Sequence, residues 1–420
     1  MLELKRITAN PDELQSMLIR RGIKDFDTIN LAKLIQATNT AQQSLDELRS
    51  QRNTASKEIG VLIGKGDKEA AESQKAAVSH LGDEINRLET DYNTQKADLD
   101  EFISGLPNWI ADGVPDGLDE TSNQELKVVG QKPEFDFKPR THYEIGEGMG
   151  ILDFERGVKL AGSRYYTYRG LLARLERALI SFMLDTHAKN GYTEVFVPQL
   201  INDAGMFTTG QFPKFRGEYY NLERDGLNLI PTAEVPLVNL YRDDIIAESD
   251  LPVALTAASS CFRREAGAAG KDTRGLVRVH QFQKVELVQL VHPDESERIH
   301  TEMLAHAESI LQALGLPYRV VLLCAGDMGA TAVKTYDIEV WMPGLNRWLE
   351  ISSVSNCLDY QARRGMIRYK GNEKKARASY VHTLNGSGVA AGRCMIAIME
   401  NYQNKDGAFD IPDVLQTYLR

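Results

Sequence analysis

The stretch FRREAGAAGKDTRGLVRVHQFQKVE, residues 262–286, sets charged side chains at the end of one apolar run and leads into a second run of alternating residues. Alternation with a period of two predicts β-strands. In an extended strand Arg263 and Glu265 lie on one face, and Arg264 lies on the other. The glycines and alanines that follow are too small to fill a core, so they predict a loop that joins two strands and closes on a ligand.

The second run, VRVHQFQKVE, places four side chains on one face of the returning strand: His280, Phe282, Lys284 and Glu286. Arginine can bind a phosphate or a carboxylate through two hydrogen bonds, an aromatic ring can stack on a base, and carboxylates accept hydrogen bonds from amines. Such a surface suits a nucleotide together with a small zwitterion. The alternative is a ladder of ion pairs on a solvated sheet face, with the ring of Phe282 covering the core.

Two further stretches carry polar groups inside apolar sequence. IPTAEVPL, residues 230–237, holds Thr232 and Glu234 between two prolines, either as a rigid polar turn or as a helix cap. TYDIEVWMPGLNRWLEISSVSN, residues 335–356, predicts a hairpin that turns at PGLN. Its second strand carries Glu350, Ser352 and Ser353, which are oxygen ligands suited to Mg²⁺ or simply a polar strand face.

The stretch LNGSGVAAGRCMIAIMENYQ, residues 384–403, predicts a glycine-rich turn that runs into a helix, with Arg393 in an early turn. A helix N-terminus beside an arginine favours phosphate binding. The glycine spacing fits neither the dinucleotide-binding fingerprint nor the P-loop, so neither of those sites is indicated.

A pair of long helices is predicted near the start of the chain. Apolar residues recur at heptad spacing from Leu31 to Leu62 and again from Val78 to Leu106, and GKGD at 64–67 separates the two runs. We therefore expect an antiparallel helical hairpin whose arms are about 50 Å long, far longer than a globular core requires. A bundle packed on the main domain or a dimerising coiled coil would produce the same heptads.

The remaining chain alternates helices with short β-rich runs. Helices are expected at 169–191 and 293–314, and strands at 192–200, 251–265, 277–291, 318–324 and 336–342. Neighbouring strands joined by turns indicate an α+β domain with a mostly antiparallel sheet. We expect an N-terminal domain over residues 1–106 with its hairpin at about 28–104, a linker and entry to the core at 107–165, and the main domain at 166–420.

Composition limits the possible functions. The chain has 420 residues, a formal net charge of −10 and four cysteines that are far apart. Its acidity argues against broad nucleic-acid binding, and the cysteines form neither a disulfide framework nor a zinc-binding pattern. We expect no structural zinc, with His292, His300 and His306 solvated on or near a polar helix. No long apolar run predicts a signal peptide or a membrane span, so a cytoplasmic location is expected.

Taken in order, these motifs resemble the class II aminoacyl-tRNA synthetases, and within them the seryl-tRNA synthetases of bacterial type. Residues 262–286 resemble the second signature motif and residues 384–403 the third. The helix and strand that end near Pro198 resemble the first motif, which in this family builds a dimer interface. The resemblance covers essentially the whole chain, including LRSQRNTASKEIG in the hairpin. It implies a class II antiparallel sheet flanked by helices and preceded by a coiled-coil hairpin.

The resemblance also implies an activity: ATP-dependent ligation of L-serine to serine tRNA through a seryl adenylate, with selenocysteine tRNA as a further candidate substrate. Arg263 and Arg393 would be the catalytic residues, and Glu350 and Ser353 would hold Mg²⁺. The implied serine-binding residues are Thr232, Ala233, Glu234, Arg263, Glu286 and Ser387. The implied ATP-binding residues are Arg263, Arg264, Glu265, Val279, Phe282, Glu350, Ile351, Ser352, Ser353 and Arg393.

For tRNA the resemblance implies contacts from the hairpin and from the loop of the second motif. These are expected at Arg49, Arg52, Lys57, Lys271 and Arg274. The protein would be a homodimer. Arg264 and Cys394 depart from the serine and threonine that are more usual in the family. Neither departure displaces a residue that is assigned to the chemistry.

Two rival functions are left open by the residues. One is a ligase that loads an amino acid onto a carrier protein, which would have no use for the long hairpin. The other is a scaffold without activity. Retention of clustered charges at Arg263, Glu265, Glu286, Glu350 and Arg393 argues against the scaffold, because such a cluster is costly to bury without a function.

Overall fold

The computed structural model describes residues 1–266, 274–373 and 375–419. The chain divides into two compact units. The larger unit contains residues 1–22 and 107–420, and the smaller contains residues 23–106.

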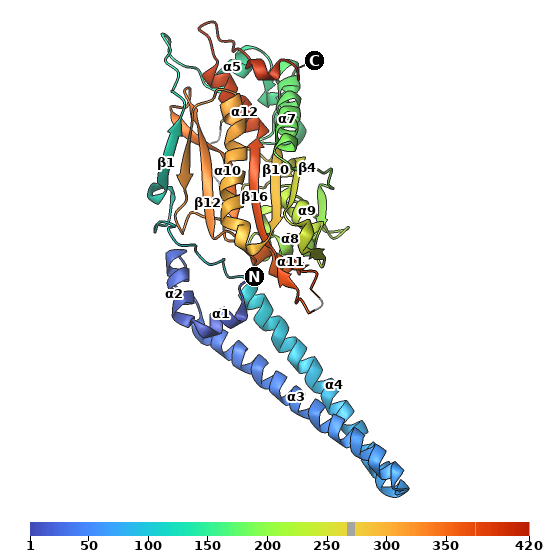
Figure 1. Cartoon of the computed structure of the whole chain (residues 1–420). Helices are drawn as coiled ribbons and strands as arrows, with labels where there is room; N and C mark the ends of the chain where they lie inside the picture. Colours follow the sequence, from blue (N-terminus) through green and yellow to red (C-terminus); the bar gives the residue numbers. More distant parts are fainter. Residues whose placement is uncertain (267–273, 374, 420) are drawn as a thin grey trace. The chain divides into compact units, whose positions relative to one another are not determined.

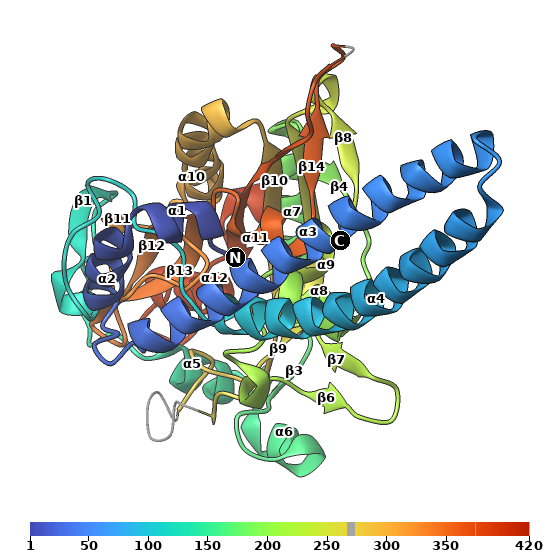
Figure 2. The same cartoon turned by 90° about the horizontal axis from the view of Figure 1, so that it is seen from below.

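The smaller unit is an antiparallel pair of long helices, α3 (Thr28–Gly64) and α4 (Lys68–Ser104), which lie side by side in Figures 1 and 2. Asp27 and Asp67 cap the two N-termini through their side chains. Gly66 has φ +81°, which permits the chain reversal between them. The buried seam includes Leu31, Ala41, Leu45, Ile85 and Leu99. The predicted helical hairpin is confirmed, although α4 begins ten residues before Val78.

An eight-stranded sheet forms the centre of the larger unit, and every neighbouring pair in it is antiparallel except β4 with β9. The mostly antiparallel α+β fold is therefore confirmed. In spatial order the strands are β1 (Gln124–Val129), β11 (Tyr318–Leu322), β12 (Lys334–Met342), β13 (Arg347–Asn356), β16 (His382–Ala390), β10 (Gln281–Val291), β9 (Val253–Phe262) and β4 (Thr193–Glu194).

Three helices cover one face of this sheet: α7 (Leu171–Lys189), α10 (Ser296–Ala313) and α12 (Ala391–Asn401) (Figure 1). A second core lies on the other face, where α9 (Glu234–Asn239) packs on β9 and β10. Successive residues of β10 serve the two cores, since Leu287 belongs to the first and Val288 to the second. Lys284 and Glu286 therefore project on the side of Val288.

Shorter elements complete the larger unit. The helices are α1 (Leu4–Ala9), α2 (Pro11–Arg20), α5 (His142–Gly148), α6 (Phe154–Ala161), α8 (Asp203–Thr208) and α11 (Tyr360–Gly365). The strands are β2 (Leu152–Asp153), β3 (Thr167–Tyr168), β5 (Leu200–Asn202), β6 (Asn221–Leu222), β7 (Leu227–Leu229), β8 (Ile245–Ala247), β14 (Arg368–Lys370) and β15 (Ser379–Tyr380).

Three local predictions were wrong. The expected strand at 192–200 is reduced to β4 and the start of β5, and part of the supposed linker forms the edge strand β1. The glycine-rich stretch after Leu384 is not a turn, because it forms most of the inner strand β16. Its glycines make room for close neighbours: a Cβ at Gly388 would lie 2.5 Å from His187 Nε2, and one at Gly386 3.1 Å from Val354 Cγ2.

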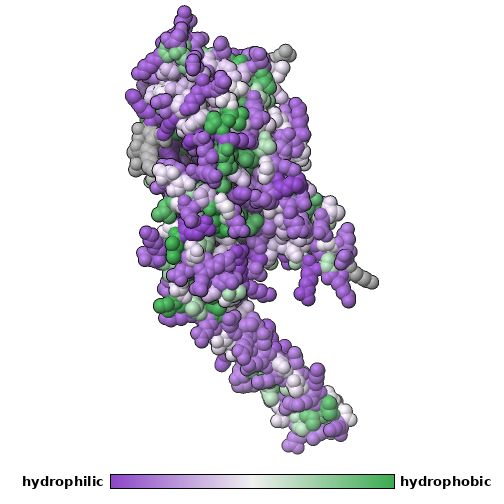
Figure 3. Space-filling model, turned by 60° about the vertical axis from the view of Figure 1, so that its left-hand side comes forward, coloured by the Kyte–Doolittle hydropathy of each residue, from purple (hydrophilic) through white to green (hydrophobic). Residues whose placement is uncertain are grey.

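The surface shown in Figure 3 is mainly hydrophilic, and hydrophobic side chains interrupt it in separate groups. Within the described ranges, every helix is too short or too polar to cross a membrane. All four cysteines are buried and have free thiols.

Candidate functional site

Two adjoining hollows open on the larger unit, and they have six lining residues in common. The first hollow is lined in part by β10, β13, β16 and the start of α12, and the second extends from it toward α9. The residues that line both are Arg263, Glu265, Arg278, Lys284, Glu350 and Ser387. A ligand with two chemically different halves could therefore occupy both hollows at once.

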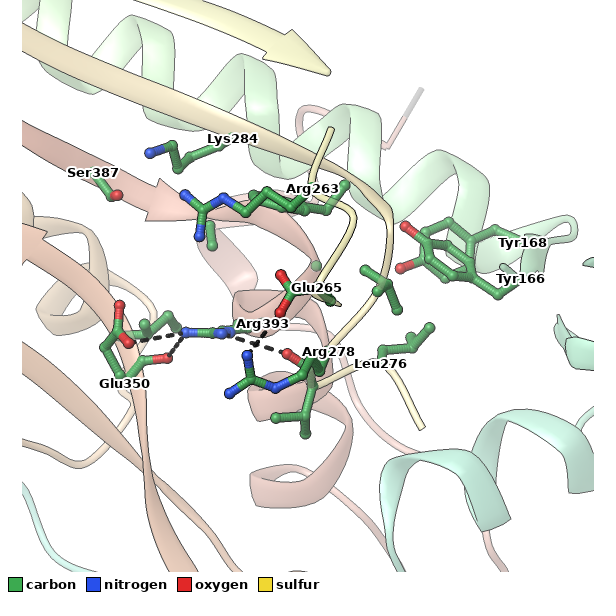
Figure 4. A pocket seen from close by; sticks show the side chains of 16 residues that line it. Tyr166, Tyr168, Arg263, Glu265, Leu276, Arg278, Lys284, Glu350, Ser387 and Arg393 are labelled. Carbon is green, nitrogen blue, oxygen red and sulfur yellow. Dashed lines mark hydrogen bonds and ion pairs between the residues drawn. The ribbon is translucent and has the colours of Figure 1, made fainter. Parts of the chain in front are cut away.

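The first hollow combines an aromatic surface with guanidinium groups. The guanidinium of Arg263 lies 5.2 Å from the ring centroid of Phe282. In Figure 4 Arg263 lies between Lys284 and Ser387 on one side and Glu265 and Arg393 on the other. Tyr166 and Tyr168 lie at one end of the hollow, and Val279 and Ile351 add apolar wall. The combination of flat apolar surface and fixed positive charge suits a nucleotide with its phosphates.

Glu265 reaches the hollow by a route that the sequence did not indicate. The ladder between β9 and β10 ends at Phe262 and Gln281, and Glu265 has a positive φ of 52°. The prediction of an extended strand through Glu265 is therefore wrong, although Arg263 and Glu265 do share a hollow. Arg278 Nη1 donates a hydrogen bond of 2.7 Å to Glu265 Oε2, which fixes the carboxylate in the wall.

Arg393 lies in the first turn of α12, where it holds two walls of the first hollow together. Its Nη1 donates to the backbone oxygen of Glu350 at 2.7 Å and lies 3.5 Å from the carboxylate Oε2 of the same residue. Its Nη2 donates to the backbone oxygen of Val277 at 3.4 Å. These bonds hold the guanidinium across the hollow from Arg263 (Figure 4).

The second hollow contains a buried cluster of charged and polar groups. The ammonium of Lys284 forms an ion pair with the carboxylate of Glu286, and Thr232 Oγ1 donates to Glu286 Oε2 at 3.0 Å. Ser387 faces Glu286 because the two residues are paired in the β10–β16 ladder. These groups lie on the sheet face that also carries Val288. Ala233 is fully buried beside Thr232, in the apolar core beneath the cluster.

Glu234 contributes a second carboxylate to this hollow. Gln361 Nε2 donates a hydrogen bond of 2.6 Å to its Oε1. Burial, followed by the nearby negative charge of Glu286, raises the pKa of Glu234 to about 7. The hydrogen bond from Gln361 and the positive charges of Lys284 and Arg263 oppose this rise. A cationic ligand would relieve the repulsion between the two carboxylates.

Oxygen ligands for a divalent cation meet where β12 pairs with β13. Asp337 faces Ser353 in the ladder, and Glu350 lines the same hollow as Ser353. The Oδ1 atom of Asp337 is buried and has no hydrogen-bond partner in the described part of the chain. Burial, and then the charge of Glu350, raise the pKa of Asp337. Two carboxylates and a hydroxyl fit Mg²⁺, which completes its shell with waters and phosphates. No group of three or more His, Cys, Asp or Glu suited to a metal occurs among the described residues.

The structure brings most of the predicted site residues together in these two hollows. Among the residues predicted for ATP and serine, Ala233, Arg264 and Ser352 are exceptions, since none of the three is among the described residues that line the hollows. Ser352 is buried and donates to the backbone oxygen of Ser387. Arg274 lies 5.9 Å from the ring centroid of Tyr143, and Lys271 lies outside the described residues. In the smaller unit Arg49 pairs with Glu89, whereas Lys57 is exposed.

Sequence reasoning gave no role in the site to Arg278, Asp337 or Gln361, and it named Lys284 only as part of a strand face. Arg278 and Lys284 lie at the same period of two as Phe282 and Glu286, so their alternation was a usable signal. Asp337 lies opposite Ser353 in the predicted hairpin 335–356, so the pairing of that hairpin was a usable signal. Gln361 enters through the packing of α11, which no local pattern indicates. The prediction that His300 is solvated was also wrong. It faces the sheet from α10, is fully buried, and has its Nε2 2.9 Å from the backbone oxygen of Val354.

Comparison with known proteins gives consistent matches along the chain. Residues 1–110 match the seryl-tRNA synthetase N-terminal domain, and residues 218–402 match the class II tRNA synthetase core domain (G, H, P, S and T). A protein named serine-tRNA ligase from Leptospira biflexa is 54% identical over 424 residues, covering 100% of each chain. Seryl-tRNA synthetase from Pyrococcus horikoshii, solved with ATP, is 36% identical, with a TM-score of 0.92 and coverage of 100% and 98%. Cytoplasmic serine-tRNA ligase from Naegleria fowleri, solved with AMP, is 29% identical, with a TM-score of 0.84 and coverage of 98% and 94%.

Proposed function

The chain belongs to the seryl-tRNA synthetase family of class II aminoacyl-tRNA synthetases, and from this premise we propose how its two hollows join L-serine to serine tRNA with ATP. The observation that carries the proposal is the position of Arg263. Its side chain lines both the aromatic, arginine-rich hollow and the buried polar hollow. A phosphate of ATP and the carboxylate of serine would meet at this guanidinium.

ATP would occupy the first hollow. Its adenine would stack on Phe282, its 6-amino group would donate to Glu265, and Arg393 would cover the other face of the base. Arg263 would hold the α-phosphate and Arg393 the γ-phosphate. The hydrogen bond from Arg278 keeps the Glu265 carboxylate in place to accept from the amino group.

Serine would occupy the second hollow. Thr232 and Glu234 would bind its ammonium, and Glu286 with Ser387 would bind its hydroxyl. The serine carboxylate would then face the α-phosphorus. Its oxygen would form a bond to that phosphorus while the bond to the bridging oxygen of diphosphate breaks. No protein nucleophile is needed, and catalysis consists of in-line positioning and fixed positive charge from Arg263 and Arg393.

Mg²⁺ would be held by Glu350, Ser353 and Asp337, where it would supply positive charge to the phosphate oxygens. In the second step a terminal ribose hydroxyl of the tRNA would attack the carbonyl carbon of the seryl adenylate. AMP would leave with the bonding electron pair. We assign no side chain as a general base for that transfer.

The first test is exchange of labelled diphosphate into ATP, because this reaction reports adenylate formation without tRNA. We expect exchange that depends on serine and on Mg²⁺, with far weaker exchange in alanine or threonine. Exchange that is equal with all three amino acids would contradict the assignment of the second hollow to serine.

A pH dependence follows from Glu234. Its pKa of about 7 in the free protein means that it is largely protonated below this pH, and serine binding through the ammonium needs the ionised form. We expect kcat/KM for serine to fall about tenfold per pH unit below pH 7 and to be flat above it. In Glu234→Gln the fall of kcat/KM below pH 7 should disappear, and kcat/KM for serine should be lower than in the wild type above pH 7. Glu176 also has a pKa raised by burial to about 7, but it does not line either hollow, so a fall that persists in Glu234→Gln would contradict this prediction.

The helical hairpin would contact the long variable arm of serine tRNA. Arg52 and Lys57 are suited to phosphates, because neither pairs with a carboxylate within the described ranges of the chain, unlike Arg49. We expect the double change Arg52→Gln, Lys57→Gln to weaken tRNA binding. The slope of log Kd against log salt should fall by about 1.4 to 1.8, since each phosphate contact contributes about 0.7 to 0.9. Lys96→Gln, which removes a cation already paired with Asp100, is the control. An unchanged slope in the double variant would rule out these two contacts.

We also propose that the protein is a homodimer that works in the cytoplasm. Phe196 follows β4 in the region of the first signature motif, and its side chain is 94% exposed in the single chain. A large aromatic group in that setting is suited to an interface. Phe196→Asp should convert the dimer to a monomer, as measured by light scattering. A monomeric wild-type protein would overturn the proposal.

The same contact with a long variable arm would admit selenocysteine tRNA as a second nucleic-acid substrate. This extension rests on the hairpin, because the amino-acid hollow is the same for both tRNAs. Charging of a selenocysteine tRNA transcript with serine is the direct test.

A further inference from the structure

A buried histidine connects the wall of the first hollow to the end of helix α12. His142 is the first residue of α5, and both His142 and Glu400 are completely buried. Glu400 lies in the last turn of α12, the helix whose first turn carries Arg393. Neither His142 nor Glu400 is among the described residues that line the two hollows, so the pair lies outside the ATP and serine sites.

Each polar atom of the pair has a partner on a different element. Glu400 Oε1 lies 2.8 Å from His142 Nδ1 and accepts from the backbone N–H of His142 at 2.9 Å. Its Oε2 accepts from the backbone N–H of Gly344 at 2.8 Å, in the turn between β12 and β13. The backbone N–H of Leu276 donates to His142 Nε2 at 3.0 Å.

These partners fix the tautomer of the ring. A backbone N–H can only donate, so Nε2 must carry a lone pair, and the ring proton lies on Nδ1, where it is donated to Glu400. The imidazole therefore accepts a hydrogen bond from the Leu276 N–H at Nε2 and donates one to the Glu400 carboxylate from Nδ1. A side chain that can only donate or only accept could not replace it.

The segment held by this bridge is part of the first hollow. Leu276, Val277 and Arg278 all line it. The backbone oxygen of Val277 accepts from Arg393, and Arg278 holds Glu265. Gly275, just before them, has φ +77°, and a Cβ there would lie 2.3 Å from His142 Nε2. The backbone therefore approaches the ring as closely as a glycine permits.

We propose that His142 is a positioning residue for the nucleotide: by accepting from Leu276 while donating to Glu400, it sets the wall segment 275–278 against α12, so that Arg278 keeps Glu265 in place for the adenine and Arg393 keeps its place beside the base and the phosphates. The proposal rests on the assignment of ATP to the first hollow. It predicts that the bond to Leu276 affects ATP much more than serine, because the side chains assigned to the serine ammonium and hydroxyl lie on β10, β16 and α9 or just before α9 and none belongs to segment 275–278.

Two conservative variants separate the two ends of the ring. In His142→Asn the amide lies near the place of Nδ1, so it retains a donor to Glu400 and loses the acceptor for Leu276. In His142→Gln the amide oxygen lies near the place of Nε2, so it retains the acceptor for Leu276 and loses the donor to Glu400. Both variants lose one buried hydrogen bond, and the bond to the Glu400 carboxylate is the stronger of the two, so a purely structural role would make His142→Gln the more damaging variant.

The experiment measures ATP binding by calorimetry, the KM values for ATP and serine in diphosphate exchange, and the thermal midpoint of each variant. We expect His142→Asn to raise the Kd and KM of ATP about tenfold, the effect of one hydrogen bond, with the KM of serine unchanged. His142→Gln should raise them no more than about threefold, although its loss of thermal stability should be at least as large as that of His142→Asn. Equal ATP constants in the two variants, or KM values for ATP and serine that rise together, would overturn the proposal.

Gly275→Ala provides a second approach if both histidine variants fail to fold. It leaves the His142–Glu400 pair in place and pushes the wall segment away from the ring. The Kd of ATP should rise, and an unchanged Kd in a folded Gly275→Ala protein would also overturn the proposal. Failure of the proposed function is distinguishable, because the wild-type protein would then show no serine-dependent exchange at all.

Discussion

Replacing Arg263 by lysine should lower kcat/KM for serine-dependent diphosphate exchange by about 10²- to 10³-fold. The reason is geometric. The guanidinium lines both hollows and can bind a phosphate and a carboxylate through its planar set of donors, whereas an ammonium is a point charge that cannot span both. The loss should appear mainly in kcat, because charge on the α-phosphate oxygens develops during the transfer.

A matched control for Arg263→Lys is Arg298→Lys, which changes an exposed arginine on α10 that pairs with two glutamates of the same surface. It should retain the wild-type rate. The thermal midpoint of Arg263→Lys should stay close to that of the wild type, since the side chain of Arg263 is exposed. A loss of less than about threefold would show that Arg263 is not the group on which the two hollows converge.

The second large effect is expected at Glu286. Its carboxylate accepts from Thr232 and pairs with Lys284, and it is 1% exposed. Glu286→Gln should lower kcat/KM for serine about 10²-fold and leave the weak reaction of alanine nearly unchanged. The selectivity for serine over alanine would therefore fall by about the same factor. An unchanged selectivity would contradict the assignment of the serine hydroxyl to this carboxylate.

Stability must be measured alongside this variant, because it removes half of a buried ion pair. Leaving the Lys284 ammonium without a charged partner costs about 3 to 5 kcal/mol. Thr256→Val is the matched control, since Thr256 is buried and donates to the backbone oxygen of Glu286 from the neighbouring strand without lining the hollow. It should lower the free energy of unfolding while the serine to alanine selectivity stays at the wild-type value.

The elements with strong local signals were predicted correctly. A short continuous stretch of sequence is enough to predict each of them: the heptads of α3 and α4, the helical period of α7, and the hairpin of β12 and β13. Strand β16 was mistaken for a turn because its glycines suggested flexibility. They are there because His187 and Val354 leave no room for a Cβ, and that close packing is a property of the assembled sheet.

The site residues also divide into those that local sequence indicates and those that depend on tertiary contacts. The alternation in residues 277–286 predicted which face would carry Phe282 and Glu286, and it could have added Arg278. Gln361 and the His142–Glu400 pair depend on contacts between residues 127 and 258 positions apart, so no window of sequence contains them. Asp337 was missed although it lies opposite Ser353 within the predicted hairpin. Most residues that the resemblance assigns to ATP and serine line the two hollows, whereas the hydrogen bonds that hold the walls of the hollows required coordinates.

Attachment of labelled serine to bulk tRNA shows whether the two hollows and the hairpin act together, and it is measured with the full-length protein, ATP and Mg²⁺, with alanine and threonine as parallel substrates. We expect rapid charging with serine and little with the other two. Failure to charge with any of the three, by a folded protein and competent tRNA, would contradict the proposed function.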